Sequence, residues 1–204
     1  MSTAALTGMR GSLRERESTT PAAERFEAIY SAHHGRVFGL AYRMMGNADD
    51  ACDIVQDAFI SAYQNLHKFG ADWPDRPVDD PHLTAWLLRI VANKCIDALR
   101  KRKRRAGLDW EAYARTAPAA PADGGHPEVH ALNSERADLI QRVLDAMTPR
   151  YRLVLLLHEH YGLSVREIAS AVERSESAVK SMLFRARDQF RALYELEGAL
   201  ARAA

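Results

Sequence analysis

The sequence predicts an all-α protein made of two small helical domains. Apolar residues recur every three or four positions over most of the chain, which is the period of one face of an α-helix. Two such stretches, 24–105 and 134–197, are separated by a segment rich in Pro, Ala and Gly. The 204 residues suffice for one or two domains. We therefore expect two helical bundles joined by a flexible linker at 106–133, with short tails at 1–23 and 198–204.

The first domain is expected to begin with two helices that are separated by a Gly-Asn pair. Apolar residues from Phe26 to Met44 follow a spacing of three and four, which predicts the first helix. Asn47 is a good N-cap for the second helix, expected over about 48–66, and acidic residues occupy its first turn. One face of this second helix is apolar and the opposite face is acidic. From spacing alone, solvation is the simpler explanation of the acidic face.

The third predicted helix, 83–105, carries the strongest charge signal. Its first part has an apolar ladder at i, i+4, and its last six residues, 100–105, are all basic. This helix holds eight bases against one acid, whereas 45–82 hold eight acids against two bases. A cationic helix end suits a phosphate backbone, and a solubilising cap on a surface helix is the alternative. The uneven charge indicates two macromolecular surfaces, one for a basic partner and one for nucleic acid.

The linker is long enough to connect two DNA-binding parts. Its 28 residues span at most ~95 Å when fully extended at ~3.4 Å each. Two turns of B-DNA cover about 70 Å. One chain could therefore contact two DNA elements about two turns apart.

The second domain carries the pattern of a helix-turn-helix. Thr148, followed by proline, reads as the N-cap of a helix that ends before Gly162. Ser164 begins a capping box that opens a short helix, and after a tight turn a longer helix runs from Glu176 to about Leu196. The longer helix has small polar and basic residues at its start, as a recognition helix does. A plain helical hairpin is the alternative.

Composition argues against several other classes of protein. The two cysteines, Cys52 and Cys95, are too few for a disulfide framework or a cysteine-rich zinc site. We find no signal peptide and no apolar run of membrane-spanning length, so we expect a cytoplasmic protein without membrane insertion. The best metal candidate is His158-Glu159-His160, but residues two apart on a helix point in different directions. We expect no metal and no cofactor.

Three segments carry a family resemblance. They are, in chain order, NADDACDIVQDAFISAYQNL, AWLLRIVANKCIDALRKRKRR and GLSVREIASAVERSESAVKSMLFRAR. With them the chain resembles bacterial RNA polymerase sigma factors of the extracytoplasmic-function (ECF) type, group 4 of the sigma-70 family, from about Phe26 to Tyr194. Each motif alone is moderately specific, and the three in this order and spacing are a strong signal.

The resemblance implies a role for each segment. The chain would not be an enzyme, because catalysis belongs to the polymerase; it would bind core RNA polymerase and recognise and open promoters. The first segment would be the polymerase-binding part, with Asp50, Asp53, Gln56, Asp57 and Phe59. The second would recognise and open the −10 element, with Asn93, Lys94, Asp97, Arg100, Lys101 and Arg104. The third would read the −35 element, with Ser175, Glu176, Ser177, Lys180, Ser181, Arg185 and Arg187. The implied partners are the β′ clamp helices and β flap of core polymerase, promoter DNA and an anti-sigma factor.

The sequence departs from the family pattern at a few positions. Glu173 stands in the turn where the family has Gly or another small residue, so we expect the local turn to differ. Ala178 and Met182 replace the usual Thr and Arg of the recognition helix, so the −35 specificity does not carry over. The loop 69–86, which cups a flipped −10 base in the family, is longer than expected.

Two other classes of protein can be compared with this interpretation. A stand-alone helix-turn-helix regulator would explain the second domain but not the first, and it would normally need a dimerisation element. A nucleic-acid enzyme would need a nucleophile or a metal constellation.

Overall fold

The computed structural model of the chain describes residues 21–66, 76–106 and 135–203. Within these ranges every regular element is a helix, which confirms the predicted all-α class. The expected linker, most of the N-terminal tail and the centre of the loop with Trp73 lie outside the described residues.

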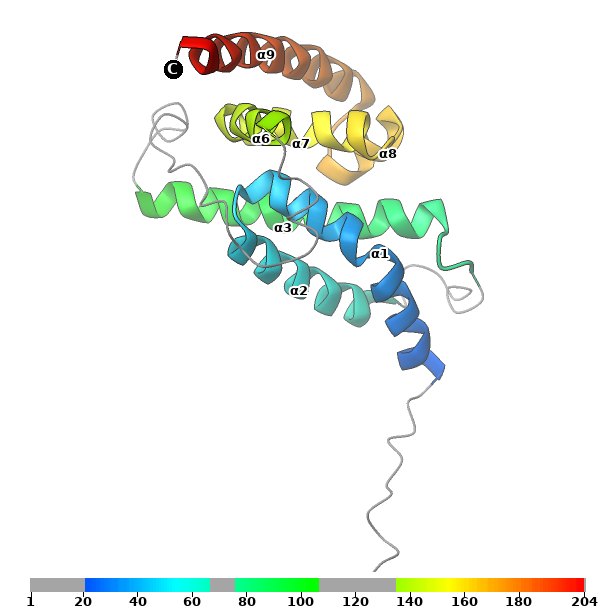
Figure 1. Cartoon of the computed structure of the whole chain (residues 1–204). Helices are drawn as coiled ribbons and strands as arrows, with labels where there is room; N and C mark the ends of the chain where they lie inside the picture. Colours follow the sequence, from blue (N-terminus) through cyan, green and yellow to red (C-terminus); the bar gives the residue numbers. More distant parts are fainter. Residues whose placement is uncertain (1–20, 67–75, 107–134, 204) are drawn as a thin grey trace, which may run out of the picture.

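The first unit is a bundle of three helices, α1 (Pro21–Met45), α2 (Ala48–Asn65) and α3 (Pro81–Ala106) (Figure 1). Gly46 ends α1 in the left-handed conformation, with φ of 78°. The next residue, Asn47, is the N-cap of α2, because its Oδ1 accepts a hydrogen bond from the Asp50 backbone N–H at 2.8 Å. The predicted N-cap is therefore confirmed, and two adjacent residues make the sharp corner between α1 and α2.

The second unit contains α6 (Glu135–Ala146), α7 (Pro149–Leu155), the π-helical turn η3 (Leu156–His160), α8 (Val165–Val172) and α9 (Glu176–Ala203). The predicted capping box at the start of α8 is confirmed. The Ser164 Oγ accepts from the Glu167 backbone N–H, and the Glu167 Oε2 accepts from the Ser164 backbone N–H at 2.8 Å. The last helix runs to Ala203, well past its expected end near Leu196, so residues 198–203 are not a separate tail.

A π-helical turn replaces the last turn of the helix that was expected to reach His160. The Tyr161 backbone N–H donates to the Leu156 carbonyl at 3.1 Å, five residues back, and Gly162 follows with φ of 71°. The wider turn rotates Tyr161 relative to a regular α-helix. This rotation matters because the Tyr161 side chain contacts α1.

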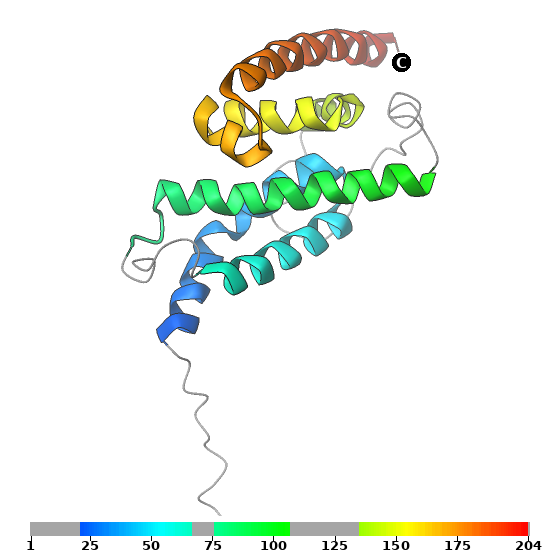
Figure 2. The same ribbon diagram turned by 180° about the vertical axis from the view of Figure 1, so that it is seen from behind.

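The two units pack directly against each other. Figures 1 and 2 show α3 lying between α2 on one side and the layer of α7 and α8 on the other. In addition, α6 and α7 contact α1. A single hydrophobic core runs through both units, from α1 to α9. The two helical domains that the sequence predicts are both present, and their cores are continuous where they meet.

Candidate nucleic-acid interface

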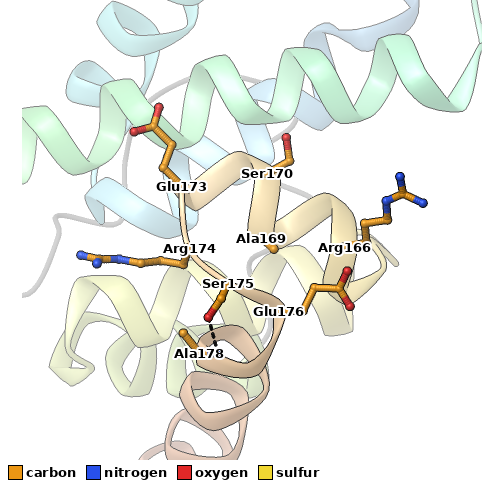
Figure 3. A pocket seen from close by; sticks show the side chains of 8 residues that line it. All are labelled: Arg166, Ala169, Ser170, Glu173, Arg174, Ser175, Glu176 and Ala178. Atoms are coloured by element: carbon orange, nitrogen blue, oxygen red, sulfur yellow. Dashed lines mark hydrogen bonds between the residues drawn. The ribbon is translucent and has the colours of Figure 1, made fainter.

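The helix-turn-helix is formed by α8, the turn at Glu173 and α9 (Figure 3). Glu173 has φ of 54° and ψ of 53°, and its backbone N–H donates to the Ala169 carbonyl. The Arg174 N–H donates to the same carbonyl at 3.0 Å. The expectation that a glutamate would change the local turn is therefore wrong. The closing hydrogen bonds keep the left-handed geometry, although it costs a non-glycine residue about 1–2 kcal/mol.

Ser175 positions the start of the recognition helix. Its Oγ accepts from the Ala178 backbone N–H at 3.2 Å, as Figure 3 shows, and lies 3.0 Å from the Ser177 Oγ. Its hydroxyl is thus used as a helix cap. Arg166 and Arg174 extend outward on opposite sides of this turn, with the Glu176 carboxylate on the same side as Arg166. Two cations on either side of a helix N-terminus can each contact a phosphate group of the DNA backbone.

The first turns of α9 present one continuous exposed face. At about 100° per residue, the exposed side chains of Ser177, Lys180 and Ser181 fall on one arc of the helix. Phe184 lies on the same arc and is 67% exposed. No role was predicted for this residue from the sequence, although its spacing of four from Lys180 and three from Ser181 places it on the same face of the helix. An exposed aromatic ring on a groove-reading face can contact the methyl group of thymine.

The two expected arginines beyond this face are engaged elsewhere. Arg185 lies at the edge of the arc, where a hydrogen bond with the Tyr151 side chain raises its pKa. Arg187 lies further along α9, and its Nη2 and Nε contact the Glu159 Oε1 at 2.7 and 2.9 Å. The structure therefore groups the serines and Lys180 at the start of α9, whereas Arg185 lies at the edge of this face and Arg187 follows two turns after Lys180, paired with Glu159.

The polar edge of α3 is a stripe along one side of the helix. Asn93, Asp97, Arg100 and Arg104 recur at three and four residues and are exposed. The Asp97 Oδ1 pairs with the Arg100 Nη1 at 3.1 Å. The first three of these residues line a cleft of about 510 Å³, and Arg174 from the helix-turn-helix lines it too. The candidate −10 surface therefore shares a cleft with the turn of the helix-turn-helix.

Acids of α2 pair with bases of α3. The Lys94 Nζ lies 3.9 Å from the Asp57 Oδ2, and the Arg102 Nη1 lies 3.7 Å from the Asp50 Oδ2. The Asp50 Oδ2 also accepts from the Asn47 side-chain amide at 2.8 Å. Such partly exposed pairs contribute only about 0–1 kcal/mol. The pair between Lys94 and Asp57 can therefore be replaced by contacts with an outside partner at little cost. Lys101, two turns after Lys94, is also exposed.

Phe59 does not belong to the polymerase-binding surface. Its side chain is 4% exposed and packs against Tyr30, with ring centroids 4.6 Å apart, and edge-on against Phe26. The assignment of this residue to a contact surface is wrong, because the ring fills the core between α1 and α2. The neighbours Ile60 and Tyr63 are 48% and 53% exposed, and no role was predicted for them from the sequence.

Asp53, Gln56 and Asp57 form the exposed acidic stripe of α2. Ile60 and Tyr63 continue this stripe at spacings of three and four residues, so a polar, acidic surface ends in an apolar one. A stripe of this kind can contact a partner helix that carries both basic and apolar side chains.

The motif His158-Glu159-His160 is occupied by internal contacts. The His158 Nδ1 lies 3.0 Å from the Leu163 carbonyl, Glu159 pairs with Arg187, and the His160 ring packs edge-on against Tyr161. Over the ranges that the structure describes, no group of three His, Cys, Asp or Glu side chains could hold a metal ion. None of the helices described is both long and apolar enough to cross a membrane.

Comparisons with known proteins agree with this geometry. Residues 29–105 match the family model of sigma-70 region 2, and residues 137–190 match that of sigma-70 region 4. The ECF RNA polymerase sigma factor SigW of Bacillus subtilis (strain 168) is 31% identical over 170 residues, covering 81% of this chain and 87% of the relative. The RNA polymerase sigma factor NccH of Alcaligenes xylosoxydans xylosoxydans is 35% identical over 163 residues, covering 79% and 83%.

Solved structures share the fold. The sigma factor RpoE from Bartonella quintana, solved with the anti-sigma factor NepR, aligns with a TM-score of 0.63 at 20% identity, covering 84% of this chain and 98% of that one. CnrH, solved with the cytosolic domain of CnrY, aligns with a TM-score of 0.52 at 24% identity, covering 86% and 96%. With both sigma-70 regions matched and relatives above 30% identity over most of their length, the chain belongs to the ECF family of RNA polymerase sigma factors, the promoter-specificity subunits of that enzyme.

Proposed function

We propose that the chain divides its task among three exposed surfaces, each on a different helix. The start of α9 reads the −35 element, the polar edge of α3 captures the −10 element, and the acidic stripe of α2 binds core polymerase. The observation that carries this proposal is the exposed face of Ser177, Lys180, Ser181 and Phe184 at the start of a helix-turn-helix recognition helix. One chain joins that face to a helix with a basic end.

At the −35 element, the first turns of α9 enter the major groove, where base edges display distinct patterns of donors and acceptors. The serine hydroxyls of Ser177 and Ser181 can donate to or accept from base edges, and Phe184 can contact thymine methyl groups. Glu176 is placed to accept from a cytosine amino group. Lys180, Arg166 and Arg174 contact phosphates and set the register of the helix.

At the −10 element, α3 binds bases that have left the duplex. Flipping a base costs a few kcal/mol, which stacking and polar contacts then recover. Asn93 and Asp97 offer hydrogen-bonding groups along one edge of α3. The cations Arg100, Lys101 and Arg104 follow on the next turns and hold the phosphates of the displaced strand.

The partners follow from the same surfaces. The acidic stripe of α2, with Asp53 and Asp57, suits the β′ clamp helices of core polymerase, and the second unit would contact the β flap. Catalysis stays with the polymerase, and the chain works beside it in the cytoplasm. An anti-sigma factor as a further partner is supported by the solved neighbour RpoE of Bartonella quintana, which is a sigma factor in complex with the anti-sigma factor NepR.

The test is run-off transcription with purified core polymerase on promoter fragments. Asp53→Arg should abolish specific transcripts by weakening the binding of core, whereas Lys180→Glu should leave the binding of core intact and abolish −35-dependent transcripts. Glu27→Arg and Arg136→Glu are matched charge reversals at exposed positions outside the three surfaces, and they should transcribe like the parent chain. Specific operator binding by the chain alone, without any transcription by an active core, would instead establish a stand-alone regulator.

A further inference from the structure

Residues 76–80 form a turn that is joined to the start of α3. The Asp80 backbone N–H donates to the Pro77 carbonyl at 3.1 Å, which closes the turn. Asp80 also caps α3, because its Oδ1 accepts from the His82 backbone N–H at 2.8 Å. The Arg76 Nη1 lies 3.1 Å from the other carboxylate oxygen of Asp80. These contacts fix the 76–80 turn relative to the first turn of α3.

Two side chains of α1 hold the backbone of the 76–80 turn. The His33 Nε2 lies 2.6 Å from the Val78 carbonyl oxygen. A carbonyl oxygen can only accept, so this ring nitrogen carries a proton and donates it. The Arg25 Nη2 donates to the Arg76 carbonyl. The N-terminal half of α1 lies at the same end of the molecule as the start of α3 (Figures 1 and 2), and it contacts the turn at two carbonyls.

The burial of His33 indicates that its hydrogen bond does more than fill space. The residue is only 3% exposed. A buried polar group costs free energy unless it is hydrogen-bonded, and an apolar side chain of similar size avoids that cost. The Val78 side chain already packs against the hydrophobic core, so an apolar residue at position 33 would be enough to cover the turn. The imidazole adds direction, because a hydrogen bond favours one placement of the Val78 carbonyl.

The 76–80 turn lies at one end of the polar edge of α3. This edge continues from Asn93 toward the N-terminus of the helix with Arg89 and His82, which are both exposed. At 100° per residue, all positions of the edge from His82 to Arg104 fall within an arc of about 80°, and at 1.5 Å per residue the edge is about 33 Å long. A strand that lies along this edge, with its phosphates held at the basic end, reaches the 76–80 turn at the other end.

We propose that His33 and Arg25 are positioning residues for the capture of the −10 strand. They act through the Val78 and Arg76 carbonyls, which they hold in place, and thereby fix the turn against which the last bases of the single strand are bound. The inference rests on the proposed function of α3 as the −10 surface. It adds two residues of another helix that determine how selectively one end of the element is bound.

The test measures how much each base of the −10 element contributes to the open complex. Abasic sites are placed one at a time in the −10 element of a promoter that the parent chain transcribes, and open complexes formed by the full-length chain with core polymerase are quantified.

The variants separate the hydrogen bonds from packing. His33→Phe fills the space without a donor, whereas His33→Gln keeps an N–H that can reach the same carbonyl. Arg25→Met removes the guanidinium and keeps an unbranched stem. His158→Phe is the matched control, because the His158 Nδ1 makes the same kind of contact in the second unit, 3.0 Å from the Leu163 carbonyl oxygen. Circular dichroism shows that each variant is folded before its profile is measured.

In the parent chain, we expect an abasic site at one end of the −10 element to lower open-complex formation about tenfold. In His33→Phe and Arg25→Met the same abasic site should lower it only about twofold, because the turn is no longer held in one place. Abasic sites at the other positions should keep their full effect. His33→Gln should restore the parent profile, and His158→Phe should leave it unchanged.

A parent-like profile in both His33→Phe and Arg25→Met would overturn the positioning role. An equal loss at every position would show that these residues only stabilise the fold, and it would overturn the role too. Asn93→Ala separates this failure from failure of the proposed function. If Asn93→Ala also leaves the profile unchanged, α3 is not the −10 surface. If Asn93→Ala alters the profile and His33→Phe does not, only the positioning role fails.

Discussion

Replacing Glu173 with glycine should stabilise the helix-turn-helix. Glu173 is the one non-glycine residue with positive φ among the described residues, at φ of 54° and ψ of 53°. A left-handed conformation costs an ordinary L-residue about 1–2 kcal/mol. Glycine avoids this cost but loses about 0.5–1 kcal/mol through the greater freedom of its unfolded chain. The difference predicts that Glu173→Gly raises the free energy of unfolding by up to about 1.5 kcal/mol, with a central value of roughly 0.75 kcal/mol.

Urea unfolding of the full-length chain, followed by circular dichroism, measures this effect. Glu173→Ala is the matched control, because it removes the carboxylate but keeps the Cβ atom that makes the conformation costly. We expect the transition midpoint to rise for Glu173→Gly and to stay close to that of the parent chain for Glu173→Ala. Equal midpoints for the two variants would show that the left-handed turn stores no strain, and the reasoning from φ would then fail.

Three further predictions concern the recognition surfaces and a helix cap. Phe184→Ser should lose about tenfold in transcription from promoters with thymine at one −35 position and much less from others, because losing the match at one base pair costs about 1–3 kcal/mol. A library of single −35 base changes measures this. Lys101→Ala and Arg104→Ala should each lower by about 1 the slope of the logarithm of the promoter-binding constant of the polymerase complex against the logarithm of salt concentration. Arg136→Ala should leave this slope unchanged. Hydrogen bonds from Ser164 lower the pKa of Glu167. The ionised Glu167 carboxylate therefore stabilises the fold above the usual glutamate pKa, and this stabilisation is lost as pH falls through the lowered pKa. Glu167→Gln should flatten the acid branch of the plot of unfolding free energy against pH, and an unchanged acid branch would contradict this.

Features set by a few neighbouring residues could be predicted from the sequence. The N-cap at Asn47 and the capping box at Ser164 need only a side chain and a backbone N–H three residues away, so local sequence determines them. The apolar spacing of α2 also placed Phe59 on the buried side, and the resemblance then assigned it to a contact surface. The structure supports the spacing, because the ring lies in the core.

Features that depend on distant parts of the chain were not predicted. Glu173 keeps a left-handed turn because Ala169 and the packed helices α8 and α9 fix the backbone on both sides. Arg152 reads as a surface residue of a short helix, yet it is buried against the end of α1, more than a hundred residues earlier. No local pattern in the sequence indicates that the Arg152 guanidinium donates to a backbone carbonyl of the other unit.

The shared hydrophobic core holds the two units together. Leu153 of α7 is 3% exposed and lines the cleft beside Ile96 of α3. Exposing one such leucine side chain to water costs roughly 1.5–3 kcal/mol, and Arg152 would lose its carbonyl partner on α1 at the same time. Opening therefore costs several kcal/mol in total, which is a modest part of what a protein interface of standard size can supply. The acidic stripe of α2 stays exposed while the two units are packed together, so a partner that binds this stripe can reach the chain before the units separate.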